Sequence, residues 1–173
     1  MTIDELKNLT ENILETFVKA GQMALELRTK GLKTIIKPDN TPVTNGDMEI
    51  DKKIRKKLTE ITPNIPLISE ETVNLNKKNI YKNFWLIDPI DGTADYIKNK
   101  DEFTINASLI NNLEPVIGII YAPAKKRLFY SYGNGLAFEE SDKKKIKLDC
   151  KKKTKIGEVH ALSTSNELPD EIL

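Results

Sequence analysis

Two short apolar runs that end in acidic residues constrain this chain more than any other feature of its sequence. Residues 65–68 (Ile-Pro-Leu-Ile) lead into Ser69-Glu70-Glu71, and residues 84–87 (Phe-Trp-Leu-Ile) lead into Asp88-Pro89-Ile90-Asp91. Short apolar runs bounded by turn-forming residues are typical of buried strands. Carboxylates that converge at strand ends repel one another unless cations hold them together. The sequence therefore predicts neighbouring strands that deliver several carboxylates to one place.

Two amphipathic helices are predicted before these runs. Apolar residues at steps of three and four follow a Thr2-x-x-Glu5 capping box and continue to Gly31, which should end the first helix. The same spacing predicts a second helix that begins around residues 45–47 and stops before Pro63. Between the helices we expect a short strand over residues 34–37 and a turn-rich loop over residues 37–44.

Alternating apolar and polar residues predict an antiparallel sheet in the second half of the chain. We expect Phe103, Tyr121, Tyr130 and Tyr132 to pack in the core of this sheet. The expected strands cover residues 103–110 and 115–121, which form a hairpin, and residues 128–132, 136–139 and 146–148.

The chain is expected to contain one domain and the start of another. After a lysine-rich stretch the pattern restarts, with a strand predicted over residues 159–163 and a helix turn over residues 166–173. A strand and one helix turn cannot bury their own apolar face. We therefore expect an N-terminal α+β domain over residues 1–153 and the beginning of an incomplete α/β domain over residues 154–173.

Composition excludes several classes of protein and of partner. The 27 Lys and Arg residues nearly balance the 26 Asp and Glu residues, so the net charge gives no overall electrostatic field that would attract DNA or RNA. No apolar run approaches the roughly 20 residues of a membrane span, and the acidic first residues do not resemble a signal peptide. Cys150 is the only cysteine, which excludes an internal disulfide and fits a reducing cytoplasm. Peripheral membrane association stays open, and the oligomeric state is not indicated.

The acidic segment after residue 87 predicts a magnesium site beside a phosphate site. A turn over residues 88–91 can aim the carboxylates of Asp88 and Asp91, with a carbonyl between them, toward one point. Oxygen ligands of this kind suit Mg²⁺, which is commonly shared with a substrate phosphate. Gly92 lets the backbone approach a ligand, and Thr93 is expected to cap a helix whose free amides hold phosphate oxygens. An isolated pair of aspartates at this spacing usually serves turns and caps, so the interpretation depends on all the acidic segments together.

The segment Trp85-Leu86-Ile87-Asp88-Pro89-Ile90-Asp91-Gly92-Thr93 resembles the signature of the inositol monophosphatase superfamily, which comprises Mg²⁺-dependent, lithium-sensitive phosphomonoesterases. Within it, residues 37–47, 102–106 and 121–123 are more similar to the 3′(2′),5′-bisphosphate nucleotidases of the CysQ type than to the inositol enzymes. The resemblance implies a layered α/β/α/β/α sugar-phosphatase fold.

The same resemblance implies a set of metal ligands. The first ion would be held by Glu70, Asp88 and the carbonyl of Ile90, and Asp91 would join Asp88 at the second. Two or three Mg²⁺ ions and inhibition by lithium are expected from the family. A further metal-binding aspartate of the family, in a Trp-Asp motif, would lie beyond Leu173, so we expect this chain to be a truncated form or a fragment.

The resemblance also implies the residues that activate water and hold the substrate. Thr93, paired with Asp47, would orient and help to deprotonate the attacking water, and Glu71 would assist. The amides of Gly92 and Thr93 would hold the phosphate group. The only histidine, His160, is expected to be structural.

Three functions are left open by these residues. The first is removal of the 3′-phosphate from 3′-phosphoadenosine 5′-phosphate, and the second is hydrolysis of an inositol or sugar phosphate. Thr164 and Asn166 replace an Arg and a His of the CysQ-type enzymes, which weakens the nucleotide prediction more than the phosphatase prediction. The third is a non-catalytic metal-binding remnant, or half of an enzyme that another chain completes.

Overall fold

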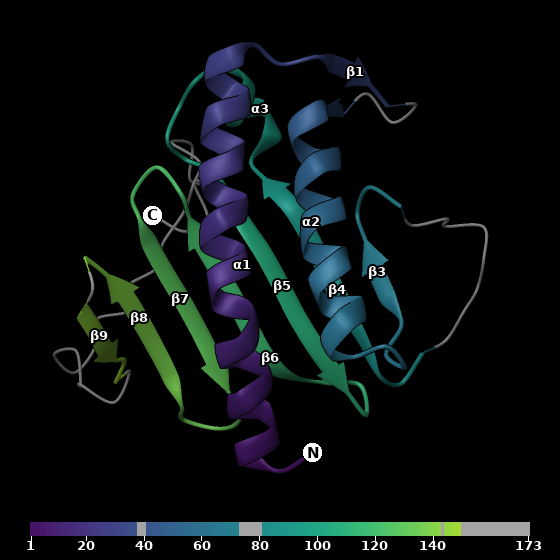
Figure 1. Ribbon diagram of the computed structural model, residues 1–173, viewed down its shortest axis with the longest axis vertical. Helices are drawn as coiled ribbons and strands as arrows, with labels where there is room; N and C mark the ends of the chain where they lie inside the picture. Colours follow the sequence, from purple (N-terminus) through teal and green to yellow (C-terminus); the bar gives the residue numbers. More distant parts are fainter. Residues whose placement is uncertain (38–40, 73–80, 143, 150–173) are drawn as a thin grey trace, which may run out of the picture.

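The computed structural model describes residues 1–37, 41–72, 81–142 and 144–149, which form helices packed on a mixed sheet (Figure 1). The helices are α1 (Ile3–Lys30), α2 (Asn45–Ile61) and α3 (Thr93–Ile97). The strands are β1 (Thr34–Ile36), β2 (Pro42–Thr44), β3 (Leu67–Ser69), β4 (Phe84–Asp91), β5 (Thr104–Asn111), β6 (Glu114–Ala122), β7 (Arg127–Tyr132), β8 (Ala137–Ser141) and β9 (Lys144–Lys147).

Local sequence signals account for the ends of both long helices, as predicted. The backbone amide of Glu5 donates to the Thr2 hydroxyl (3.2 Å), and the backbone amide of Thr2 donates to the Glu5 carboxylate (2.7 Å). This capping box satisfies donors that the first turn of α1 leaves free. Gly31 ends α1 with φ +97°, and a second capping box at Thr44 begins α2. The predicted start and stop of each helix are confirmed.

The sheet has seven strands in the order β3-β4-β5-β6-β7-β8-β9. Only β3 and β4 run parallel, and the remaining neighbours are antiparallel. The predicted hairpin is confirmed as β5 and β6, and the three shorter predicted strands are found within two residues of their predicted ends. The prediction for residues 42–44 is wrong: these residues, assigned to a loop, form β2 and pair with β1.

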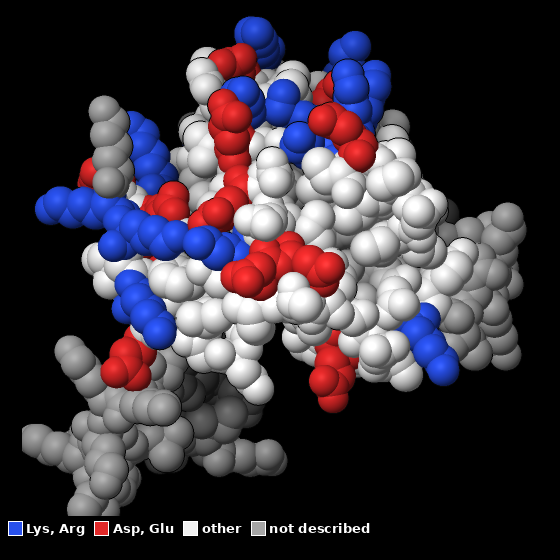
Figure 2. All heavy atoms as spheres, turned by 60° about the horizontal axis from the view of Figure 1, so that its bottom comes forward, with Lys and Arg blue, Asp and Glu red and all other residues white. Residues whose placement is uncertain are grey.

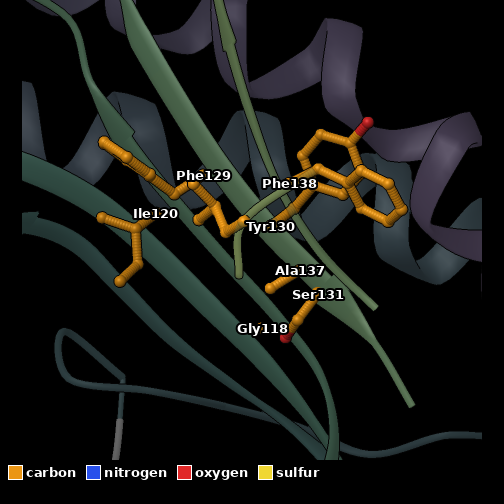
Figure 3. Close-up of a pocket in the computed structure, with 8 residues that line it drawn as sticks. Gly118, Ile120, Phe129, Tyr130, Ser131, Ala137 and Phe138 are labelled. Atoms are coloured by element: carbon orange, nitrogen blue, oxygen red, sulfur yellow. The ribbon is translucent and has the colours of Figure 1, made fainter. Parts of the chain in front are cut away.

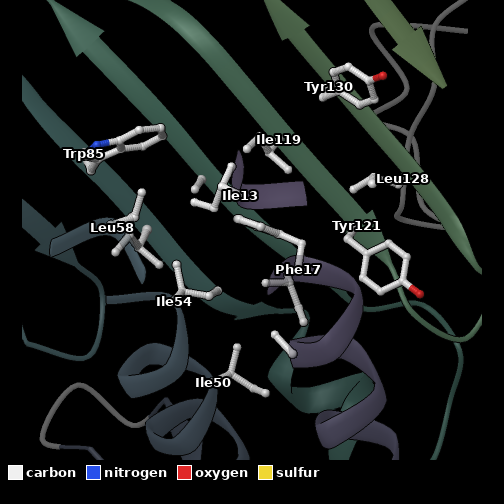
Figure 4. Packing of buried hydrophobic residues seen from close by; sticks show 14 of the residues in the cluster. Ile13, Phe17, Ile50, Ile54, Leu58, Trp85, Ile119, Tyr121, Leu128 and Tyr130 are labelled. Atoms are coloured by element: carbon white, nitrogen blue, oxygen red, sulfur yellow. The ribbon is translucent and has the colours of Figure 1, made fainter. Parts of the chain in front are cut away.

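Helices α1 and α2 cover one face of the sheet, and the core lies between them and the strands (Figures 1 and 4). Phe17 from α1, Ile54 from α2 and Trp85 of β4 belong to one cluster of buried side chains, and all three are fully buried. The Trp85 indole N–H donates to the Thr62 hydroxyl (3.0 Å), which satisfies the one polar atom of this side chain. The four aromatic residues predicted to lie in the core are buried: Phe103, Tyr121, Tyr130 and Tyr132.

The opposite face of the sheet, here called the outer face, carries side chains that are only partly covered by the described residues. Leu86 and Ile120 on this face are 47% and 48% exposed. A shallow pocket of about 190 Å³ lies on strands β6–β8, where Gly118, Ser131 and Ala137 are small beside Ile120 and Phe129 (Figure 3). No helix of the described residues is long and apolar enough to span a membrane.

Some predictions fall on residues outside the described part of the chain. They are the strand and helix turn over residues 159–173, the second domain from residue 154, and the assignments for Cys150, His160, Thr164 and Asn166.

Candidate active site

The parallel pair of strands brings two acidic segments together. Ser69 of β3 is in register with Ile87 of β4, and the Glu70 amide donates to the Ile87 carbonyl (3.1 Å). Because parallel strands end at the same edge of a sheet, Glu70 and Glu71 after β3 lie beside Asp88. Two runs that are about 20 residues apart in the sequence thus supply carboxylates to one edge.

A β-bulge in β4 places Asp88 and Asp91 on the same face of the sheet. Asp88 pairs with Asn106, and Asp91 pairs with Thr104, so three steps on β4 match two on β5. In a regular strand, residues three apart point to opposite faces. The extra residue of the bulge shifts the alternation by one, so that Asp91 points to the same face as Asp88. The bulge lies at Pro89 and Ile90, which are both buried although they are consecutive. The predicted turn over residues 88–91 is wrong, since these residues continue the strand.

Asp47 joins the site from the first turn of α2, where it is 1% exposed. One carboxylate oxygen accepts from the Thr44 amide (2.7 Å) and the Thr44 hydroxyl (2.5 Å). The Thr93 hydroxyl oxygen lies 3.2 Å from the other Asp47 oxygen and 2.9 Å from the Ile90 carbonyl oxygen. Its single proton can serve only one of these acceptors at a time. Asp47 and Thr93 are 46 residues apart in the sequence, and the packing of α2 against β4 brings them together.

Gly92 connects β4 to α3 in a conformation that favours glycine. Its φ is +88°, and an added Cβ would lie 2.8 Å from the Glu102 carbonyl oxygen. The amides of Asp95 and Tyr96 both donate to the Gly92 carbonyl (2.9 Å). Gly92, and not Thr93 as predicted, is therefore the N-cap of α3, which leaves the Thr93 hydroxyl available to Asp47 and Ile90.

Lys37 contributes a positive charge that the sequence did not assign to the site. Its ammonium nitrogen lies 3.0 Å from a Glu71 oxygen and 3.3 Å from a Glu70 oxygen. Burial alone would lower the pKa of Lys37, but the hydrogen bonds and charges of these two carboxylates raise it above its ordinary value. Burial also raises the pKa of Glu71, against the opposing effect of Lys37. The lysine thus acts as a counterion for the glutamate pair.

Asp88 is partly buried and is repelled by three neighbouring carboxylates. Burial is the largest cause, and together with the charges of Glu70, Asp91 and Asp47 it raises the pKa of Asp88 to about 7. One Asp88 oxygen is buried without a hydrogen-bond partner in the described part of the chain. A buried acceptor with no donor is costly, and a cation or a proton removes this cost.

The chemistry of the donor set fits a hard divalent cation. Carboxylate and carbonyl oxygens are the ligands that Mg²⁺ prefers. Across residues 1–37, 41–72, 81–142 and 144–149, however, no three His, Cys, Asp or Glu side chains already stand in a metal-binding arrangement. The described carboxylates are gathered at one edge of the sheet without converging on a single point.

A polar cavity of about 690 Å³ adjoins the carboxylates. Asp91 and Gly92 form its border with the site, and Lys100 and Lys125 lie on its wall. The Lys125 ammonium is 3.6 Å from a Glu102 oxygen. This volume is enough to hold a small polar molecule next to Asp91.

Comparisons with known sequences agree on one family. A profile of the inositol monophosphatase family matches residues 5–171. The 3′(2′),5′-bisphosphate nucleotidase CysQ of Buchnera aphidicola subsp. Acyrthosiphon pisum is 35% identical over 98% of this chain and 65% of its own length. The CysQ protein of Escherichia coli K12 is 37% identical over 65% of this chain and 46% of its own. The chain spans about half to two thirds of the length of these relatives.

Comparisons with solved structures agree on the fold. CysQ from Bacteroides thetaiotaomicron has a TM-score of 0.57 and 31% identity, over 78% of this chain and 49% of its own. The suhB protein of Bartonella henselae has a TM-score of 0.69 and 21% identity, over 77% of this chain and 52% of its own. An IMPase/NADP phosphatase complexed with Mg²⁺ and phosphate has a TM-score of 0.69 and 24% identity, over 78% of this chain and 51% of its own.

Proposed function

The chain belongs to the inositol monophosphatase family, and from this premise we propose that it carries the metal-binding part of a Mg²⁺-dependent phosphomonoesterase. The proposed reaction removes the 3′-phosphate of 3′-phosphoadenosine 5′-phosphate by attack of water. The similarity to proteins named as CysQ nucleotidases favours this substrate over an inositol or sugar phosphate. The balanced net charge, and the mixture of acidic and basic side chains on the face seen in Figure 2, favour a small substrate over a nucleic acid.

The gathering of Glu70, Asp88 and Asp91 at one sheet edge is the observation that supports this proposal best. Asp88 has a raised pKa and a buried oxygen with no hydrogen-bond partner among the described residues, as expected for a group that is completed by a cation. In the proposal, these three carboxylates and the Ile90 carbonyl hold the ions. Bound Mg²⁺ would lower the pKa of a coordinated water and neutralise charge on the phosphoryl group.

The remaining side chains would place the water and the substrate. One Asp47 oxygen accepts from the amide and the hydroxyl of Thr44, and the other lies 3.2 Å from the Thr93 hydroxyl oxygen, so Asp47 can accept a hydrogen bond from Thr93. A Thr93 hydroxyl that donates to Asp47 presents its free lone pairs to a water molecule, which it can orient; it can accept a proton from that water only as its own proton passes to Asp47. Glu71 would assist beside Lys37. The amides of Gly92 and Thr93 would hold phosphate oxygens, and the adjoining cavity would hold the rest of the substrate.

Neutralising Asp91 tests this proposal. Asp91→Asn should abolish Mg²⁺-dependent release of phosphate from the nucleotide, because it removes a ligand charge while it changes no packing in the core. Glu139→Gln is a matched control, since this carboxylate lies on β8 of the same sheet and pairs with Arg127. Full turnover in Asp91→Asn would contradict the proposed metal role.

A substrate panel and a Mg²⁺ titration separate the proposed function from its alternatives. Preference for an inositol monophosphate over the nucleotide would support the second function. Binding of Mg²⁺ without hydrolysis would support a remnant or half-enzyme. Inhibition by lithium and a cytoplasmic location belong to the same proposal. The division into a domain over residues 1–153 and a second one from residue 154 stays a prediction.

A further inference from the structure

Asn106 occupies the position on β5 directly opposite Asp88, on the face that also carries Asp91. Its side-chain amide donates to an Asp91 oxygen at 3.2 Å. The Asn106 carbonyl oxygen is buried and, like the Asp88 oxygen across from it, has no hydrogen-bond partner among the described residues. The side-chain nitrogen of Asn106 is therefore held by Asp91, while the side-chain oxygen is buried like the Asp88 oxygen across from it.

A neutral amide suits this position between two repelling carboxylates. Directly paired side chains on neighbouring strands have Cβ atoms about 4.5–5.5 Å apart, so Asn106 is within reach of both aspartates. An N–H donor stabilises and orients the Asp91 anion without adding a positive charge that would compete with a cation. By contrast, Lys37 neutralises the glutamate pair with a full charge on the other side of the site.

We propose that Asn106 is a positioning residue for the cation site, which holds the Asp91 carboxylate in the orientation that lets it share a divalent cation with Asp88. This inference rests on the proposed function. Residues that hold metal ligands in place commonly change cation affinity by 10- to 100-fold when they are removed. Asn106 is predicted to act in this way, through Asp91 and not through contact with the substrate.

Cation affinity of the whole chain is the direct test, with Mg²⁺ alone as the probe in isothermal titration calorimetry. Asn106→Ala and Asn106→Leu both remove the donor, and the second keeps the number and branching of the side-chain heavy atoms. Each should weaken Mg²⁺ binding by about 10- to 100-fold. The unfolding midpoint without Mg²⁺ should stay close to that of the unchanged chain. Ser108→Ala is the matched control, because Ser108 lies two residues along the same face of β5 and its hydroxyl donates to the Ile117 carbonyl (2.9 Å).

A double variant separates positioning from a general structural effect. If Asn106 acts through Asp91, then Asn106→Ala should weaken Mg²⁺ binding less than twofold once Asp91→Asn is present. Mg²⁺ affinities of both Asn106 variants within twofold of the unchanged chain, alongside a loss in Asp91→Asn, would overturn this inference and leave the proposed function standing. Unchanged Mg²⁺ affinity in Asp91→Asn would instead overturn the proposed function, and this inference with it.

Discussion

The buried hydroxyl of Tyr96 makes the stability of the chain depend on alkaline pH in a calculable way. Tyr96 is fully buried, and its hydroxyl donates to the Ala24 carbonyl of α1 at 2.7 Å. Burial, with a smaller contribution from the charge of Asp47 and an opposing one from Arg28, raises the pKa of Tyr96 from 10.0 to about 12. The folded state thus favours the protonated phenol.

The sign and size of the effect follow from this raised pKa. The stabilisation is complete below the unfolded value of 10.0 and is lost as pH rises through the folded value of about 12. Two pKa units correspond to about 2.7 kcal/mol in full, of which about 1.4 kcal/mol is lost by about pH 11. Tyr96→Phe removes this dependence and also removes the hydrogen bond to Ala24, at a cost of about 1 kcal/mol.

Urea unfolding of both chains between about pH 8 and 11 measures the prediction. The unchanged chain should be more stable by about 1 kcal/mol at the lower pH, and the two stability curves should meet near the upper one. Other tyrosines and lysines titrate in both chains, so their contributions cancel in the difference. A gap that stays constant over this range would refute the assignment of a raised pKa to Tyr96.

Three further predictions concern packing. Gly46→Ala would bring a Cβ to 2.8 Å from the Tyr96 hydroxyl oxygen, so it should lower the free energy of unfolding by about 1–3 kcal/mol, as chemical denaturation would show. Phe17→Ala should cost about 3–5 kcal/mol, whereas Val18→Ala on the exposed side of α1 should change stability by no more than about 0.5 kcal/mol. Because Trp85 is the only tryptophan and is fully buried, its fluorescence should shift to longer wavelength in the same transition that circular dichroism detects, and separate midpoints would contradict a single cooperative unit.

Local signals in the sequence predicted most of the elements. The capping box at Thr2, the stop at Gly31 and the period of the apolar residues act within one or two turns of helix, so a single sequence contains them in full. Strand alternation likewise predicted the hairpin of β5 and β6. Residues 42–44 were missed because three residues that include Pro42 carry little strand pattern until β1 pairs with them.

Parts of the candidate site depend on pairing that the sequence does not reveal. The acidic residues stood out by type, but the bulge that turns Asp91 to the side of Asp88 exists only relative to β5. Asn106 was noticed as part of a motif without a role, since its contact with Asp91 follows from strand register. Lys37 lies 33 residues before Glu70 and 34 before Glu71 in the sequence, so only the tertiary fold brings them together.

The bulge in β4 also determines where a backbone carbonyl group lies, which substitution of side chains does not change. With one residue more than its partner strand, β4 carries a peptide group outside the regular ladder, and Thr93 approaches the carbonyl of Ile90 in this stretch. Deleting one residue between Asp88 and Asp91 would restore a regular strand with both aspartates still on one face, but it would remove the spare backbone oxygen. Chain length in this segment would therefore be under stricter selection than the identity of the two residues between the aspartates.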